Sequence, residues 1–336
     1  MKIHYISLLS ALLLWAMLAT SCENQITIDL KPAPTQLIIH AQMNADSTNN
    51  RIFLNLTDPD KLKDVTDGII EIRINGQLTE TPQRIAPTAN KPAANSYLVT
   101  SAFRPGDVVR VDARTANGQY RAWSEVVVPQ PASIEGAIDT LTTQIRYQTS
   151  YRSAVRYGIH IKDRPGEKNY YRLIVEQQGT FAYFADNRPG EVSVIKGKNT
   201  HMIIRDDIVL TDGKPSHDTD QDLFDQPDNL YGIFDDKRFA DGSYTMSVYT
   251  LKDSFLYPSN YDVRVWWQVD AYVRVLSISE AEYRYLQTLN IVDSDTSGEI
   301  MEPVKFGTNV NGGLGIVSIS SEVSRKVSFP KQIYPK

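Results

Sequence analysis

Short segments in which apolar and polar residues alternate recur along the chain, and turn residues separate them. The segments 70–74 and 109–113 each lead to an Asn-Gly pair, at Asn75 and at Asn117. Alternation with a period of two buries one face of a strand, and Asn-Gly is a strong hairpin signal because both turn residues take positive φ. The pattern therefore predicts a mainly β protein.

Strand spacing and proline placement predict two β-rich regions. Strands at intervals of about 8–15 residues indicate that 35–129 is a β-sandwich of immunoglobulin or fibronectin type. Two prolines with one residue between them make 129–131 a stiff linker. The second region, 133–336, is predicted to be a larger β-rich domain with long loops at 184–243 and a strand at 201–204 inside them.

One helix is predicted near 279–292. Ser279 and Glu282 have the spacing of a capping box, in which the N-cap hydroxyl and the N3 carboxylate each satisfy a backbone N–H. Ala281, Tyr285 and Leu289 follow at helical spacing, and the acidic run after residue 292 ends the helix.

The N-terminal segment predicts export and a lipid anchor. The apolar run from Ile6 to Ala19 would be roughly 21 Å long as a helix, which is short for a ~30 Å hydrocarbon core. Small residues before the only cysteine, Cys22, resemble a bacterial lipobox, in which the thiol carries fatty acyl chains such as palmitate. We therefore expect a signal peptide at 1–21 and a tether at 22–34. An ordinary signal peptide is the alternative.

Composition excludes several classes of function. A single cysteine rules out a disulfide framework, and a formal net charge of -5 argues against nucleic-acid binding. The histidines of the expected mature chain form no closely spaced ligand pair; they are His40, His160, His201 and His217. We therefore predict no catalytic residues and no bound cofactor. The carboxylate pair of a glycan-acting hydrolase would be set by the fold, so that class stays open.

An acidic stretch offers one candidate metal site. It begins like an EF-hand loop, but Leu223 stands where glycine is needed and Asn229 where glutamate is needed. A looser calcium site would use Asp218, Asp220, Asp222 and Asp225. The alternative is a solvated acidic loop.

Aromatic residues provide the candidate ligand-binding site. Trp266 and Trp267 are adjacent in a predicted strand, so their side chains point to opposite faces. We expect Trp267 in the core with its valine neighbours. Trp266, Tyr183 and Phe184 are then candidates for an exposed patch that binds a sugar or a protein. The alternative is ordinary packing of all three.

Four segments in a fixed order carry a family resemblance: 163–172, 234–242, 276–286 and 308–316. With the lipobox, they resemble the domain of unknown function 4249 family of the Bacteroidetes. The resemblance implies a lipid-anchored outer-membrane protein, encoded beside a TonB-dependent transporter, and it transfers no catalytic residue.

The expected function is therefore non-enzymatic. The resemblance and the lipobox favour a surface-exposed accessory or ligand-binding partner of a TonB-dependent nutrient transporter. A surface adhesin or surface-structure component is the alternative, and a glycan-acting hydrolase is a weaker one.

Overall fold

A computed structural model describes residues 34–58, 61–88, 95–147, 150–184, 191–213, 229–252, 264–294 and 304–333. Thr35–Lys336 form one compact unit. The predicted signal peptide, Cys22 and the tether up to residue 33 lie outside the described residues. In the part that is described, no helix is both long enough and apolar enough to cross a membrane.

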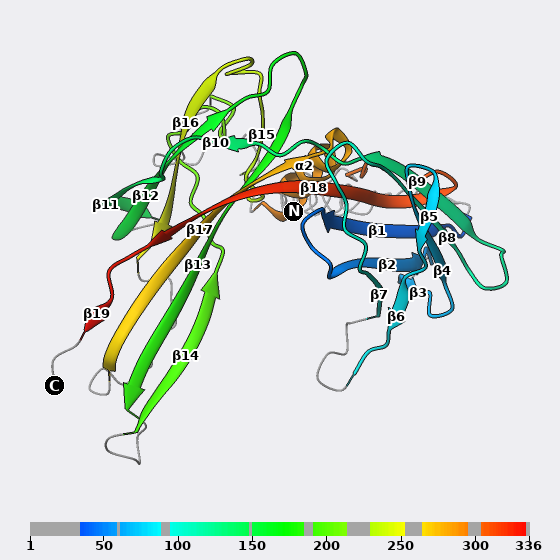
Figure 1. Ribbon diagram of the computed structural model, residues 1–336, viewed down its shortest axis with the longest axis horizontal. Helices are drawn as coiled ribbons and strands as arrows, with labels where there is room; N and C mark the ends of the chain where they lie inside the picture. The colour runs from blue at the N-terminus through cyan, green and yellow to red at the C-terminus, as the bar shows by residue number, and fades with distance from the viewer. Residues whose placement is uncertain are drawn as a thin grey trace, which may run out of the picture. The chain divides into compact units, whose positions relative to one another are not determined.

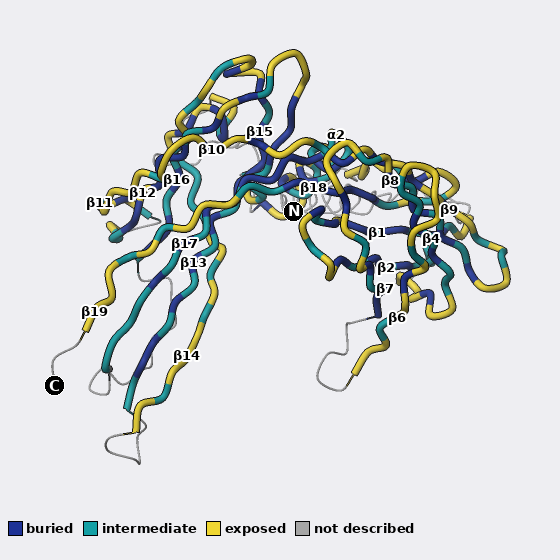
Figure 2. Tube along the Cα trace, viewed as in Figure 1, coloured by how far each residue is buried: buried dark blue, intermediate teal, exposed yellow. Residues whose placement is uncertain are grey.

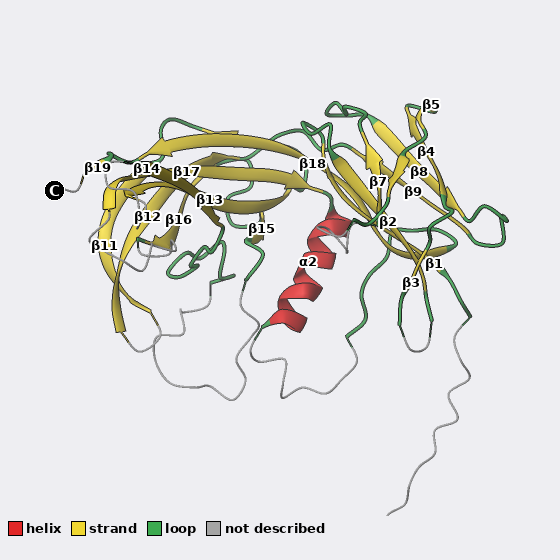
Figure 3. Cartoon of the chain, turned by 90° about the horizontal axis from the view of Figure 1, so that it is seen from below, coloured by secondary structure: helices red, strands yellow, loops and turns green. Residues whose placement is uncertain are grey.

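The described chain is mainly β, which confirms the predicted fold class (Figure 3). Its strands are β1 (Leu37–Asn44), β2 (Asn50–Leu56), β3 (Lys63–Asp64), β4 (Ile69–Ile74), β5 (Gln77–Glu80), β6 (Gln83–Ile85), β7 (Ser96–Val99), β8 (Val108–Arg114), β9 (Arg121–Val127), β10 (Ser133–Ile134), β11 (Asp139–Tyr147), β12 (Ser150–Lys162), β13 (Tyr170–Phe184), β14 (Val192–Asn199), β15 (Ile233–Asp235), β16 (Ser243–Leu251), β17 (Arg264–Ile278), β18 (Gly313–Ser328) and β19 (Gln332–Ile333). The helix is α2 (Glu280–Asp293).

The strands form three sheets (Figure 1). An 11-stranded sheet has the order β14-β13-β17-β18-β1-β2-β7-β6, with β15, β19 and β3 paired beside this path. A 4-stranded sheet, β5-β4-β8-β9, packs on its N-terminal strands. A second 4-stranded sheet joins β10, β11 and β16 to β12 and packs on β13 and β17.

The 16-residue strand β18 belongs to both packing regions. It pairs in parallel with β1, from Leu37↔Gly313 onward, and then antiparallel with β17. Val317 and Ile319 lie in the first core, whereas Val323 and Val327 pack against the second. Since these side chains alternate along one strand, one face of the large sheet carries both cores. The sheet is therefore continuous across the predicted linker at 129–131, which follows β9.

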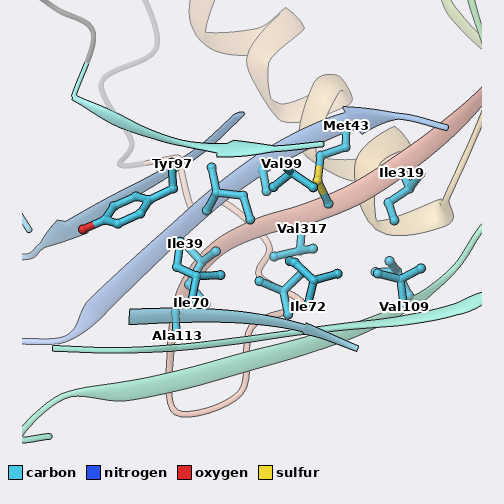
Figure 4. Packing of buried hydrophobic residues seen from close by; sticks show 14 of the residues in the cluster. Ile39, Met43, Ile70, Ile72, Tyr97, Val99, Val109, Ala113, Val317 and Ile319 are labelled. Atoms are coloured by element: carbon cyan, nitrogen blue, oxygen red, sulfur yellow. The ribbon is translucent and has the colours of Figure 1, made fainter. Parts of the chain in front are cut away.

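The first core lies between the large sheet and β4, β8 and β9. Ile39 and Val317 of the large sheet face Ile70 and Ile72 of β4 (Figure 4), and all four are fully buried. Burying such a side chain stabilises the fold by about 1.5–3 kcal/mol. The alternation of buried and exposed residues is visible along the strands of Figure 2.

Helix α2 covers the opposite face of the large sheet, as its polar contacts show. Gln42 of β1 donates a hydrogen bond to Oε1 of Glu282 at 3.3 Å, and His40 meets Tyr285 ring to ring at 5.9 Å. The predicted N-cap is confirmed, because the Glu282 N–H donates to Oγ of Ser279 at 3.2 Å. The Glu282 carboxylate is buried against the sheet.

The predicted turns and strands have mixed outcomes. Asn75 and Gly76 form the expected two-residue turn, with φ of 52° and 82°. Asn117 does not, because a longer loop is closed by the Thr115 N–H donating to the Tyr120 carbonyl. The strand predicted at 201–204 is wrong: only Ile203 makes an isolated bridge there, and a regular strand, β14, precedes it.

Candidate functional site

The outward face of the β5-β4-β8-β9 sheet carries an unusual set of charges. Along β8, Val109, Val111 and Ala113 point into the core, so Arg110, Asp112 and Arg114 point outward. The same alternation in β4 and β9 presents further polar side chains beside them. The strand pairing therefore sets which residues are neighbours on this face.

Strand register arranges these side chains in three rows. The Arg114 row contains Ile69, Arg114 and Arg121, and the Trp123 row contains Glu71, Asp112 and Trp123. The Arg110 row contains Arg73, Arg110 and Glu125. Directly opposite residues have Cβ atoms about 4.5–5.5 Å apart, so members of one row are neighbours.

All members of these rows except Glu125 line an open groove of about 670 Å³. This volume lies within the range of about 300–1,000 Å³ that is typical of ligand sites. Four arginines and two carboxylates line the groove, which gives the lining a formal charge of +2. We call it the arginine groove; its charged residues are Glu71, Arg73, Arg110, Asp112, Arg114 and Arg121.

Arg110 and Arg73 are held by the two carboxylates. Arg110 donates two hydrogen bonds to Asp112, from Nε to Oδ2 at 2.9 Å and from Nη2 to Oδ1 at 2.8 Å. Its guanidinium also lies 4.0 Å from the ring centroid of Trp123, a cation–π contact. The hydrogen bond with Asp112 raises the pKa of Arg110. Arg73 donates to Glu71 at 2.5 Å.

A loop before β18 closes the β9 side of the groove. The Trp123 N–H donates to the Asn311 carbonyl at 3.0 Å, and the Asn311 N–H donates back at 2.7 Å. Gly312 adopts φ of +72°, and a Cβ there would lie 2.9 Å from the Arg121 carbonyl oxygen. The glycine therefore allows the loop to lie against β9.

The groove is suited to binding. Guanidinium groups recognise carboxylate and phosphate, and the indole of Trp123 is 37% exposed. The residues that line the groove include no serine, cysteine or histidine. Both lining carboxylates already accept hydrogen bonds from arginines.

A family model described as Domain of unknown function (DUF4249) matches residues 23–326. The chain belongs to this family. The match includes every residue that lines the arginine groove. No curated protein matches this DUF4249 protein.

The structure brings the predicted aromatic residues to one end of β13 and β17. Trp266 pairs with Ala182, and the register shifts between Ala182 and Tyr183, so regular alternation ends beside Trp266. All three are half-buried. Lys331 lies 3.8 Å from the ring centroid of Trp266. Their role in ligand binding stays a prediction.

Trp267 is partly buried and packs with Phe181, Val269 and Phe329 in a small cluster. Its ring stacks on Phe181 with centroids 6.0 Å apart, and its indole N–H donates to Gln332. Trp267 therefore packs with Val269 as predicted, but it is only partly buried and lies in this satellite cluster rather than in the core.

The predicted calcium ligands Asp218, Asp220, Asp222 and Asp225 lie outside the described residues, as does Cys22. Within the described part of the chain, no group of three or more His, Cys, Asp or Glu side chains is placed to hold a metal ion.

Sequence reasoning missed the arginine groove. No functional role was predicted for Trp123 from the sequence. The signal was an arginine at an outward position of each of three strands, at Arg73, Arg110 and Arg121, that become neighbours only in the folded sheet. These arginines can be recognised as one site only when the strand register shows that they are neighbours on one face.

Proposed function

We propose that this DUF4249 protein is a non-enzymatic lipoprotein of the cell outer membrane, exposed at the cell surface. It serves as an accessory subunit of a TonB-dependent nutrient transporter, and the arginine groove is its binding face. The groove is the observation that supports a binding role most directly. Cys22 in its lipobox supports the anchor, and the family resemblance supports the transporter.

The chemistry of the groove favours binding over hydrolysis. A glycan-acting hydrolase needs one carboxylic acid free to protonate the leaving oxygen and a second carboxylate beside it. Glu71 and Asp112 are neighbours across β4 and β8, but each already accepts hydrogen bonds from an arginine. Neither is free for that proton transfer.

Affinity purification from native membranes tests the transporter partnership. The full chain carrying a C-terminal tag is expected to recover the transporter. Replacing both Trp123 and Arg110 by alanine removes the exposed indole and the guanidinium above it, and should lower recovery at least about tenfold, as for an interface hot spot.

The matched control is Tyr151→Ala, which removes an aromatic side chain that is 75% exposed on β12. Its recovery should equal that of the parent. Repeated absence of the transporter with intact parent protein would contradict the partnership. Equal recovery with the Trp123 and Arg110 variant would exclude the groove as the binding face.

Labelling with a radioactive fatty acid tests the anchor. The parent chain should incorporate label and sediment with the cell envelope, whereas Cys22→Ala should do neither. The lipid anchor would be refuted if the parent protein took up no label and if the parent and Cys22→Ala sedimented equally with the envelope.

A further inference from the structure

The register of the groove places arginine opposite arginine twice. Arg73 pairs with Arg110 across β4 and β8, and Arg114 pairs with Arg121 across β8 and β9. Like charges directly opposite each other destabilise a sheet. Negative charge nearby, from the protein or from a ligand, would relieve this repulsion.

The first pair receives that charge from the protein. Asp112 and Glu71 in the next row bind Arg110 and Arg73 through hydrogen bonds. These two carboxylates balance these two guanidiniums, and Glu125, directly opposite Arg110 in its row, adds a further negative charge beside them.

The second pair does not receive it. Among the described residues, Arg114 has no hydrogen-bond or ion-pair partner, and Arg121 has no carboxylate partner. Arg121 donates only to the Gly118 carbonyl, at 3.3 Å. The third member of the Arg114 row is Ile69, which carries no charge. The +2 charge of the groove lining is thus concentrated on Arg114 and Arg121.

We propose that Arg114 and Arg121 form an oxyanion site that takes a carboxylate or phosphate group of the ligand held in the groove. This inference rests on the proposed binding function of the groove. Both arginines line the groove from adjacent strands, and carboxylate and phosphate oxygens are what guanidinium donors recognise. Trp123 lies in the next row, beside the bound group.

Thermal unfolding of the detergent-solubilised full chain tests this site, with citrate and inorganic phosphate as the two probes. Each is added at millimolar concentration with sodium chloride holding the ionic strength constant. At least one probe should raise the Tm of the parent, because a ligand that binds only the folded state stabilises it. The probe that acts identifies the preferred oxyanion.

The double variant Arg114→Gln/Arg121→Gln should lose most of this Tm shift, with an apparent affinity lowered at least tenfold. Its own Tm without anion should equal or exceed that of the parent, because the like-charge repulsion is gone. The matched control is Arg104→Gln/Arg146→Gln, which removes two exposed guanidiniums outside the groove. It should keep the full shift.

Any one of three outcomes would overturn the oxyanion site. The first is that neither probe raises the Tm of the parent, and the second is that the control loses as much of the Tm shift as the groove variant. The third is that the groove variant, without anion, has a Tm several degrees below that of the parent. Failure here is separate from failure of the proposed function. Affinity purification can still recover the transporter, through contacts at Trp123, when neither citrate nor phosphate changes the Tm.

Discussion

Replacing Gly315 by alanine should strongly destabilise the protein, because β1 and β18 approach each other closely there. Gly315 has φ of +110°, and a Cβ would lie 2.1 Å from the Ile39 carbonyl oxygen. A strained backbone of this kind costs about 1–3 kcal/mol for a residue with a side chain. The Ile39 carbonyl belongs to a paired strand and cannot move without loss of sheet hydrogen bonds, so overpacking adds about 1–3 kcal/mol.

The expected total for Gly315→Ala is therefore about 2–6 kcal/mol, a large part of a typical stability of about 5–15 kcal/mol. Two other glycines separate its causes. Gly76 has φ of +82° and open space where a Cβ would lie, so Gly76→Ala measures backbone strain alone, about 1 kcal/mol. Gly197 in β14 has neither feature, and Gly197→Ala should change stability by less than about 1 kcal/mol.

Urea denaturation followed by far-ultraviolet circular dichroism measures the free energy of unfolding of each variant. If Gly315→Ala lowers the free energy of unfolding no more than Gly76→Ala does, the close approach of β18 to β1 does not contribute to the destabilisation. The strand would then have room to move. The loop at 309–312, which precedes β18 and closes the groove, would lose its rigid support.

Two further variants probe buried polar groups. Tyr97→Phe should cost about 1–3 kcal/mol in urea denaturation, because it leaves the Gly68 N–H and the Val65 carbonyl, now 2.8 and 3.0 Å from the hydroxyl, without that partner. Burial raises the pKa of Glu282 above its usual 4.5, so the charged carboxylate destabilises the folded state increasingly as pH rises above that value. Glu282→Gln should therefore be more stable than the parent at neutral and alkaline pH but not at acidic pH; equal stability at every pH would contradict this.

Local signals in the sequence predicted local structure well. The turn at Asn75 follows from two residues whose conformations are set within the turn itself, and the start of α2 follows from the Ser279 cap. The turn at Asn117 differs because the Thr115 hydroxyl donates to the Asn117 side chain and the loop is longer. An Asn-Gly pair alone does not distinguish these two loops.

Long-range pairing was much harder to predict. β18 begins with glycines, and buried serines such as Ser318 and Ser320 lie between its core residues, so its apolar signal is weak. Its parallel partner, β1, lies at the opposite end of the chain. No short-range pattern in the sequence identifies that partner.

The arginine groove depends on long-range register in the same way, but its two halves differ physically. Arg110 is explained by the fold, since it binds Asp112 and packs over Trp123. Arg121 is not: it lies on the exposed face, and core packing does not demand an arginine there. A glutamate at that position would turn a repulsive cross-strand pair into an attractive one, worth about 0.2–1 kcal/mol. Within the fold, Arg121 donates a hydrogen bond to the Gly118 carbonyl, and the proposed anion site would give this arginine a second role that offsets the repulsion.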